Sequence, residues 1–94
     1  MKIKGIIWFP KTIDKLIWKH NVDKYEVEEV LLGKSKYRKI KKGHIPGEDL
    51  YAGLGQTKAG RYLIVFFIYK MTHEALILSA REMDKKERKQ YAQK

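Results

Sequence analysis

The segment RYLIVFFIY, residues 61–69, is apolar at nearly every position. A strand with one face in water alternates apolar and polar residues, so this unbroken run predicts a strand that is covered on both faces. Its neighbours in the chain are LYAGLGQT, residues 50–57, which leads into a short hairpin turn at 58–60, and ALILSA, residues 75–80. The sequence therefore predicts a meander of strands with residues 61–69 as its central strand.

The first third of the chain carries the signals of a strand followed by a helix. KIKGIIW, residues 2–8, is β-branched and apolar and predicts a strand, and Pro10 suits the first turn of a helix. Asn21 can adopt the left-handed conformation that ends a helix. Between them, an i, i+3, i+4, i+7 pattern typical of one helix face is formed by Ile13, Leu16, Ile17 and His20.

Two further helices are predicted by capping boxes that begin with aspartate. Asp23 stands three residues before Glu26, and Asp84 stands three residues before Glu87, so each pair can exchange hydrogen bonds at a helix N-terminus. Gly33 closes the earlier helix, and the later one is short and basic. The whole of residues 1–94 reads as one α+β domain: one antiparallel sheet, two N-terminal helices on one face, and a C-terminal helix.

The charge balance narrows the choice of partner. Lys and Arg number 21 and Asp and Glu number 11, a net charge of +10, which favours RNA, DNA, an acidic protein or an anionic membrane surface. Residues 34–42 (KSKYRKIKK) hold six of the basic residues. They predict a short edge strand or a loop, and the lysines either protect the edge of the sheet or form a surface that faces RNA. Plain solubility is the alternative reading of the charge.

Several classes of protein are disfavoured by what the sequence lacks. There is no cysteine, which excludes disulfides and a cysteine-based metal site and fits a cytoplasmic location. The apolar run near the N-terminus is far shorter than the ~20 residues of a membrane span, so no membrane association is expected. No zinc-binding histidine pair, P-loop or GxGxxG or GxSxG motif is present, so we expect neither a metal nor a cofactor.

Basic side chains at the ends of the predicted helices and strands are the remaining candidates for functional residues. His20 ends the first helix, where the helix dipole favours its protonated form, although for a lone histidine plain capping of the carbonyls there is the favoured interpretation. Arg61 opens the central strand and Arg81 leaves the next one. In an antiparallel meander these two ends meet at one edge, so we expect both arginines to face one groove, as phosphate recognition requires. The alternative for each is a solvated surface charge.

The order of these motifs resembles the BrnT family of toxins. The opening signature runs from Trp8-Phe9-Pro10 through Lys19-His20-Asn21-Val22 to a Val-rich helix, and the closing signature is Ser79-Ala80-Arg81 followed by Glu87-Arg88 and Tyr91. Gly55, Gly60 and the apolar strand after Gly60 match the middle of the family pattern. The resemblance covers nearly the whole chain.

The resemblance implies a RelE-like fold and a metal-independent endoribonuclease toxin of a type II toxin–antitoxin pair, which inhibits translation. Its partners would be an RNA substrate and a small DNA-binding antitoxin that neutralises it, with a toxin–antitoxin heterotetramer as a possible assembly. His20 takes the role of acid or base, and Arg61 and Arg81 the role of phosphate clamps. The residues expected to contact RNA are Lys19, Lys36, Arg38, Lys39, Lys70 and Arg88.

The sequence departs from the family pattern at two places. Asp49-Leu50-Tyr51 stands where the family often has Glu-Arg and an aromatic residue, and Lys70 is the only cation where the family often has another arginine. Lysine lacks the bidentate fork of arginine. These departures favour a second hypothesis, a non-catalytic module that binds nucleic acid or an antitoxin. A basic domain that binds only a protein partner is the third.

Overall fold

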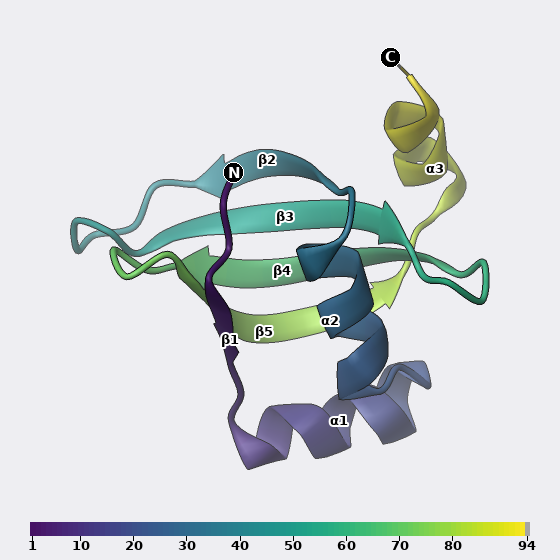
Figure 1. Cartoon of the computed structure of the whole chain (residues 1–94), viewed down its shortest axis with the longest axis horizontal. Coiled ribbons are helices and arrows are strands. Elements are labelled where there is room, and N and C mark those ends of the chain that lie inside the picture. Colours follow the sequence, from purple (N-terminus) through teal and green to yellow (C-terminus); the bar gives the residue numbers. More distant parts are fainter. Residues whose placement is uncertain (94) are drawn as a thin grey trace.

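The computed structural model describes residues 1–93 of the 94-residue chain. Five strands form one sheet in the order β1-β5-β4-β3-β2, with α1 and α2 against one face and α3 at one end (Figure 1). This arrangement confirms the α+β architecture with two N-terminal helices and a C-terminal helix. The elements in chain order are β1 (Gly5–Ile7), α1 (Pro10–His20), α2 (Lys24–Leu32), β2 (Lys36–Lys41), β3 (Asp49–Gln56), β4 (Tyr62–Tyr69), β5 (Glu74–Glu82) and α3 (Lys85–Ala92).

The apolar strand β4 is the middle strand of the sheet, as predicted. It pairs antiparallel with β3 on one side and β5 on the other. Leu63, Val65 and Phe67 point to the side of α1 and α2 and are fully buried, while Ile64 is buried on the opposite face. The unbroken apolar run thus reflects cover on both faces.

The strand β1 makes the sheet mixed. Strands β2 to β5 are antiparallel as expected, but β1 runs parallel to β5, with Gly5 opposite Glu74. A parallel neighbour needs a long crossover, and here α1, α2 and the whole meander provide it. β1 spans three residues, fewer than the segment 2–8 predicted, because the chain turns into α1 at Pro10.

The helix boundaries follow the sequence signals closely. Asn21 ends α1 with φ of 53°, and its amide donates to the carbonyl of Ile17 at 3.0 Å. Both capping boxes are present at the starts of α2 and α3. The predicted stripe of α1 is only partly buried: Leu16 is buried, whereas Ile17 is 50% exposed. The reason is that α1 packs against β5, near the edge of the sheet.

The two faces of the sheet carry separate cores. The larger core joins β4 and β5 to α1 and α2. On the opposite face a smaller core of Ala52, Leu54, Ile64 and Met83 packs with Tyr62, Phe66 and Tyr91, the last of these from α3. We call this second surface the α3 face. Within residues 1–93 no helix is long and apolar enough to cross a membrane.

The helix α2 lies very close to β3. A Cβ added to Gly53 would stand 2.9 Å from Cδ2 of Leu31, which is closer than real side chains approach. A larger residue at this position would therefore force the Leu31 side chain of α2 to shift, which agrees with the usual role of glycine where another element approaches a strand closely.

Candidate nucleic-acid interface

Arg81 belongs to β5, and its side chain lies on the α3 face between Phe66 of β4 and Glu87 of α3. Its guanidinium donates to both carboxylate oxygens of Glu87, at 2.8 Å each, and its centre stands 5.6 Å from the ring centroid of Phe66. The hydrogen bonds from Arg81 lower the pKa of the Glu87 carboxyl, and the same bonds raise the pKa of Arg81. Arg81 therefore stays charged, with its planar group held against an aromatic ring.

A second guanidinium is paired with an aromatic ring on the same face. Arg88 of α3 stands 4.1 Å from the ring centroid of Tyr62, and Tyr62 in turn packs edge-on against Tyr91 at 6.0 Å. Arginine planes and aromatic rings are the groups on which unpaired bases stack. The α3 face thus combines positive charge with flat surfaces.

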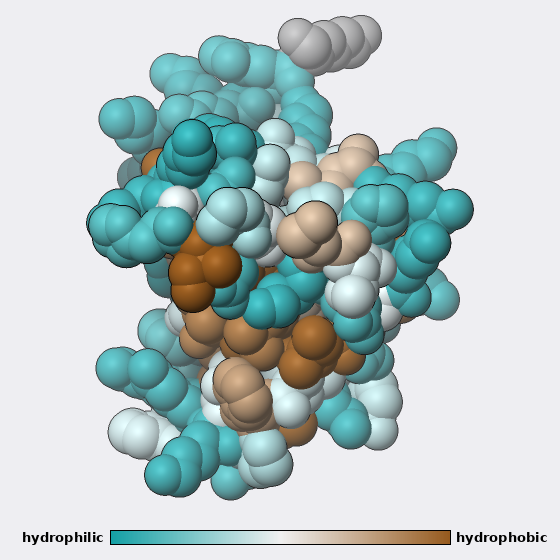
Figure 2. All heavy atoms as spheres, turned by 90° about the vertical axis from the view of Figure 1, so that its left-hand side faces the viewer, coloured by the Kyte–Doolittle hydropathy of each residue, from teal (hydrophilic) through white to brown (hydrophobic). Residues whose placement is uncertain are grey.

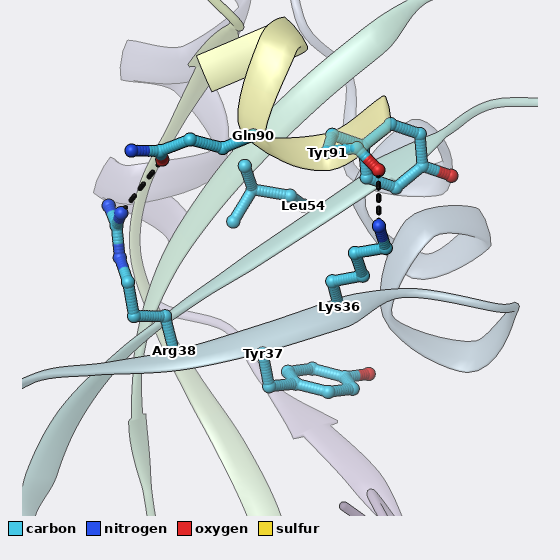
Figure 3. Close-up of a pocket in the computed structure, with 6 residues that line it drawn as sticks. All are labelled: Lys36, Tyr37, Arg38, Leu54, Gln90 and Tyr91. Carbon is cyan, nitrogen blue, oxygen red and sulfur yellow. Dashed lines mark hydrogen bonds between the residues drawn. The ribbon is translucent and has the colours of Figure 1, made fainter. Parts of the chain in front are cut away.

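The edge strand β2 adds two more of the expected RNA contacts to this face. Figure 3 shows Lys36 and Arg38 reaching from β2 to α3, while Tyr37 between them points the other way. Arg38 donates to Oε1 of Gln90 at 2.9 Å, and Lys36 donates to the carbonyl of Tyr91. The lysine-rich segment is thus an edge strand, and Lys36 and Arg38 also attach α3 to the sheet.

Arg61 lies at the corner between α1 and α2. Its guanidinium contacts both carboxylate oxygens of Glu26 at 2.9 Å and the carbonyl of Asn21 at 2.8 Å. His20, the half-buried last residue of α1, belongs to the same corner, and Lys19 beside it is exposed. The structure therefore binds Arg61 to the carbonyl of Asn21, the residue that follows His20 in the chain.

The expectation that Arg61 and Arg81 face one groove is not met. The strand register does place them at the same end of the sheet, since Arg81 pairs with Ile64 and Arg61 directly precedes β4. They leave opposite faces, however, because Arg61 contacts Glu26 of α2 while Arg81 packs over Phe66. A hollow of about 390 Å³ at this end is lined by Gly60, Arg61, Tyr62, Glu82, Met83 and Arg88.

Lys39 and Lys70 lie at the other end of the sheet. Lys39 forms an ion pair with Asp49 at 3.0 Å, and Lys70 forms one with Glu48 at 2.8 Å. Neither lysine shares the α3 face with Arg81. The residues expected to contact RNA thus fall into three groups rather than one.

The sequence analysis missed the acidic partners of both arginines. Each arginine is bound by the glutamate of a capping box, Glu26 for Arg61 and Glu87 for Arg81, and that glutamate also accepts from the aspartate amide at the helix start. The capping boxes were visible in the sequence, but their spacing shows only the local bonds. Which arginine also reaches each carboxylate depends on tertiary structure.

The lowered pKa of the Glu87 carboxyl predicts that the folded protein loses stability in acid. Its folded pKa lies below the ordinary 4.5, so its contribution to stability is complete above that pH and is lost as the pH falls through the lowered folded value. We expect wild type to lose thermal stability more steeply than Glu87→Gln below about pH 4.5. Melting curves of both proteins across this range test this, and parallel pH profiles would contradict it.

No group of three or more His, Cys, Asp or Glu residues within residues 1–93 is placed to hold a metal ion. A scan against protein-family models finds no match, and a search of the curated proteins finds no significant relative. The resemblance to the BrnT toxins therefore rests on the residues quoted for it.

Proposed function

We propose that this protein is a metal-independent endoribonuclease toxin of a type II toxin–antitoxin pair, which inhibits translation and is neutralised by a small antitoxin. The observation that carries the proposal is the pairing of guanidinium groups with aromatic rings on the α3 face. Arg81 lies over Phe66 and Arg88 over Tyr62, so each pair offers a charge for a phosphate and a flat surface for a base.

The chemistry needs a base, an acid and cations. A ribose 2′-hydroxyl gives its proton to the base and its oxygen attacks the adjacent phosphorus, while the bond to the 5′-oxygen breaks and that oxygen takes up a proton. Cations stabilise the negative charge that develops on the phosphate oxygens. In this proposal Arg81 binds the phosphate and His20 serves as acid or base.

The RNA path in this proposal passes around one end of the sheet. His20 and Arg61 lie at the corner of α1 and α2, and Arg81 lies on the α3 face. The hollow lined by Arg61 and Arg88 joins the two sides. A phosphate bound to either clamp competes with a glutamate, Glu26 for Arg61 or Glu87 for Arg81.

Those same glutamates favour a second function. Both arginines already make charge-assisted hydrogen bonds within the domain, which lowers the gain from binding a phosphate. A non-catalytic module would bind nucleic acid or an antitoxin through the α3 face, and for this Arg61 and Arg81 can stay paired with their glutamates. The two functions differ in whether RNA is cut.

Induced expression followed by a cleavage assay separates these functions. We expect growth arrest in cells that express the wild-type chain, and cleavage of RNA by the purified protein in the presence of EDTA, since no metal takes part in the proposed reaction. The same gene with an early stop codon is the control for the burden of expression. Normal growth and intact RNA, from protein shown to be folded and soluble, would contradict the toxin and favour the binding module.

A further inference from the structure

A row of aromatic rings runs outward from the core at the end of the sheet opposite to α3. Tyr51 stacks on buried Phe67 with centroids 6.1 Å apart, and Tyr69 packs edge-on against Tyr51 at 5.9 Å. His73, in the turn between β4 and β5, stacks on Tyr69 at 5.7 Å with the two planes only 4° apart. The row leads from the hydrophobic core to an exposed imidazole.

This row borders a hollow of about 330 Å³. Its lining comes from the start of β3, the end of β4 and the turns beside them: Gly47, Asp49, Tyr51, Tyr69, Lys70, Met71 and His73. Figure 2 faces this end of the molecule and shows apolar residues gathered in a band across the middle, with hydrophilic residues above and below it. The rings of Tyr51, Tyr69 and His73 form walls of the hollow, and exposed Met71 and His73 also line it.

Charged side chains of both signs border the hollow. Lys70 lines it, and Nζ of Lys39 stands 5.9 Å from the ring centroid of Tyr51. The N-terminal segment borders the same place, because the amide of Lys4 donates to the carbonyl of His73 at 2.8 Å and the Tyr69 hydroxyl donates to the carbonyl of Lys2. A ligand in the hollow therefore meets aromatic walls at its centre and lysines at its rim.

The backbone at His73 is held in an unusual conformation. Its φ is 69°, in the left-handed region that residues other than glycine seldom adopt, and its amide donates to the carbonyl of Lys70 at 2.9 Å. Such conformations cost free energy and cluster at active sites, ligand clamps and switch regions. At this turn the conformation presents an imidazole where glycine would be the least strained residue.

We propose that this hollow binds one unpaired nucleobase of a single-stranded RNA, stacked against the His73 and Tyr69 rings with its neighbouring phosphates on Lys39 and Lys70. The inference rests on the proposed function for the identity of the ligand and adds a base-binding subsite to it. Base–aromatic stacking tolerates any base, so the subsite holds the strand in place and selects unpaired over paired RNA.

The lysines at the rim are already paired with carboxylates, so phosphates of a strand must compete with Asp49 and Glu48 for them. Lys39 is bound to Asp49 and Lys70 to Glu48, and both lysine side chains are partly exposed. Because these side chains are exposed in part, phosphates of a strand can reach them at the rim while the base stacks on an open face of the His73 and Tyr69 rings. An acidic peptide would use the same lysines but has no need of the aromatic row, and this difference makes the test possible.

His73→Gly is the variant of choice. It removes the ring, and glycine adopts the observed φ without strain, so the folded state is kept or stabilised. His73→Asn serves as a second variant, since asparagine also tolerates this conformation. His44→Gly is the matched control, because it removes an exposed histidine from the loop between β2 and β3 at a position outside the lining of the hollow.

Two probes report on the site. Adenosine 5′-monophosphate is titrated while the ring protons of Tyr51, Tyr69 and His73 are followed by NMR. An uncleavable single strand of 2′-O-methyl RNA that carries one 2-aminopurine reports stacking by loss of fluorescence. We expect the ring signals to move, the fluorescence to fall, and His73→Gly to bind the strand about tenfold more weakly, while His44→Gly binds it as wild type does.

The outcomes separate this inference from the proposed function. If wild type binds the strand and His73→Gly and His73→Asn bind it equally well, with the ring signals unmoved, the subsite is refuted and the toxin proposal stands. If adenosine monophosphate moves the ring signals although the protein neither arrests growth nor cuts RNA, the base site stands and the toxin fails. Movement of the ring signals by oligoglutamate but not by either nucleotide probe refutes the subsite.

Discussion

Replacing Arg81 with alanine is expected to lower the rate of RNA cleavage by ~10²–10³-fold, the usual loss when one donor to a developing negative charge is removed. Growth arrest on expression should disappear with it. Arg81 presents two nitrogens in one plane and lies against Phe66, so no other cation on the α3 face can take its place without moving. Cleavage of a labelled RNA in EDTA, under single-turnover conditions, measures the effect.

Two variants separate phosphate binding from a structural role of Arg81. Glu87→Gln breaks the ion pair but keeps the arginine, so cleavage should persist if Arg81 acts on RNA and should fail if the Arg81–Glu87 pair only holds the site together. Arg81→Lys keeps the charge without the fork and should recover a minor part of the rate. A folded Arg81→Ala that remains fully toxic would remove Arg81 from the proposed machinery.

His20→Ala is part of the same series. We expect this variant to fold and to have lost toxicity, because His20 is the proposed acid or base and ends α1 on the surface of the corner. Its pH–rate profile adds information that a structural role would not give, since removal of an acid or base should abolish one limb of the wild-type profile. If the variant keeps the wild-type pH–rate profile and rate, His20 is neither acid nor base and only caps the end of α1.

Phe67→Ala is expected to lower the free energy of unfolding by ~3–5 kcal/mol. Phe67 is fully buried in the middle of the central strand, stacked on Tyr51 and edge-on to Tyr37. Removing its ring leaves a cavity between the sheet and α2 that these neighbours cannot fill. Because a domain of this kind has only about 5–15 kcal/mol of stability, the variant should be close to unfolding at 37 °C.

Urea unfolding followed by circular dichroism measures this loss. Leu78→Ala is the matched control, because Leu78 is 43% exposed on the neighbouring strand, and it should cost well under half as much. Equal losses for the two variants would mean that the ring of Phe67 is not the centre of the core. The aromatic row of the proposed base site begins at Phe67, so this variant also tests whether the row depends on the core.

The fold could be predicted because its signals are local or nearly so. The apolar run of β4, Asn21 at the end of α1 and the two aspartate-led capping boxes each specify their element without help from distant residues. The parallel pairing of β1 with β5 could not be predicted in this way. A three-residue strand carries too little pattern to choose its neighbour.

The candidate site was harder to predict than the fold. The predicted order and direction of the strands placed Arg61 and Arg81 at the correct end of the sheet. The face of the sheet on which each side chain lies depends in addition on the alternation of side chains along the strand and on the residue at which the strand begins. Ion pairs with Glu26 and Glu87 and the stacking of His73 on Tyr69 join residues whose positions only tertiary structure fixes. Spacing in the sequence carries no signal for such contacts.

The pairing of β1 with β5 also sets the order in which the protein can form. Gly5 pairs with Glu74, so the two partners are 74 − 5 = 69 residues apart in the chain. During synthesis the first strand waits without its neighbour until β5 has left the ribosome, whereas the residues of the hairpins β2–β3 and β3–β4 emerge earlier. Such distant pairings also slow folding. A nascent or truncated chain that lacks β5 has an incomplete sheet, so the proposed activity would arise only once β5 has been made.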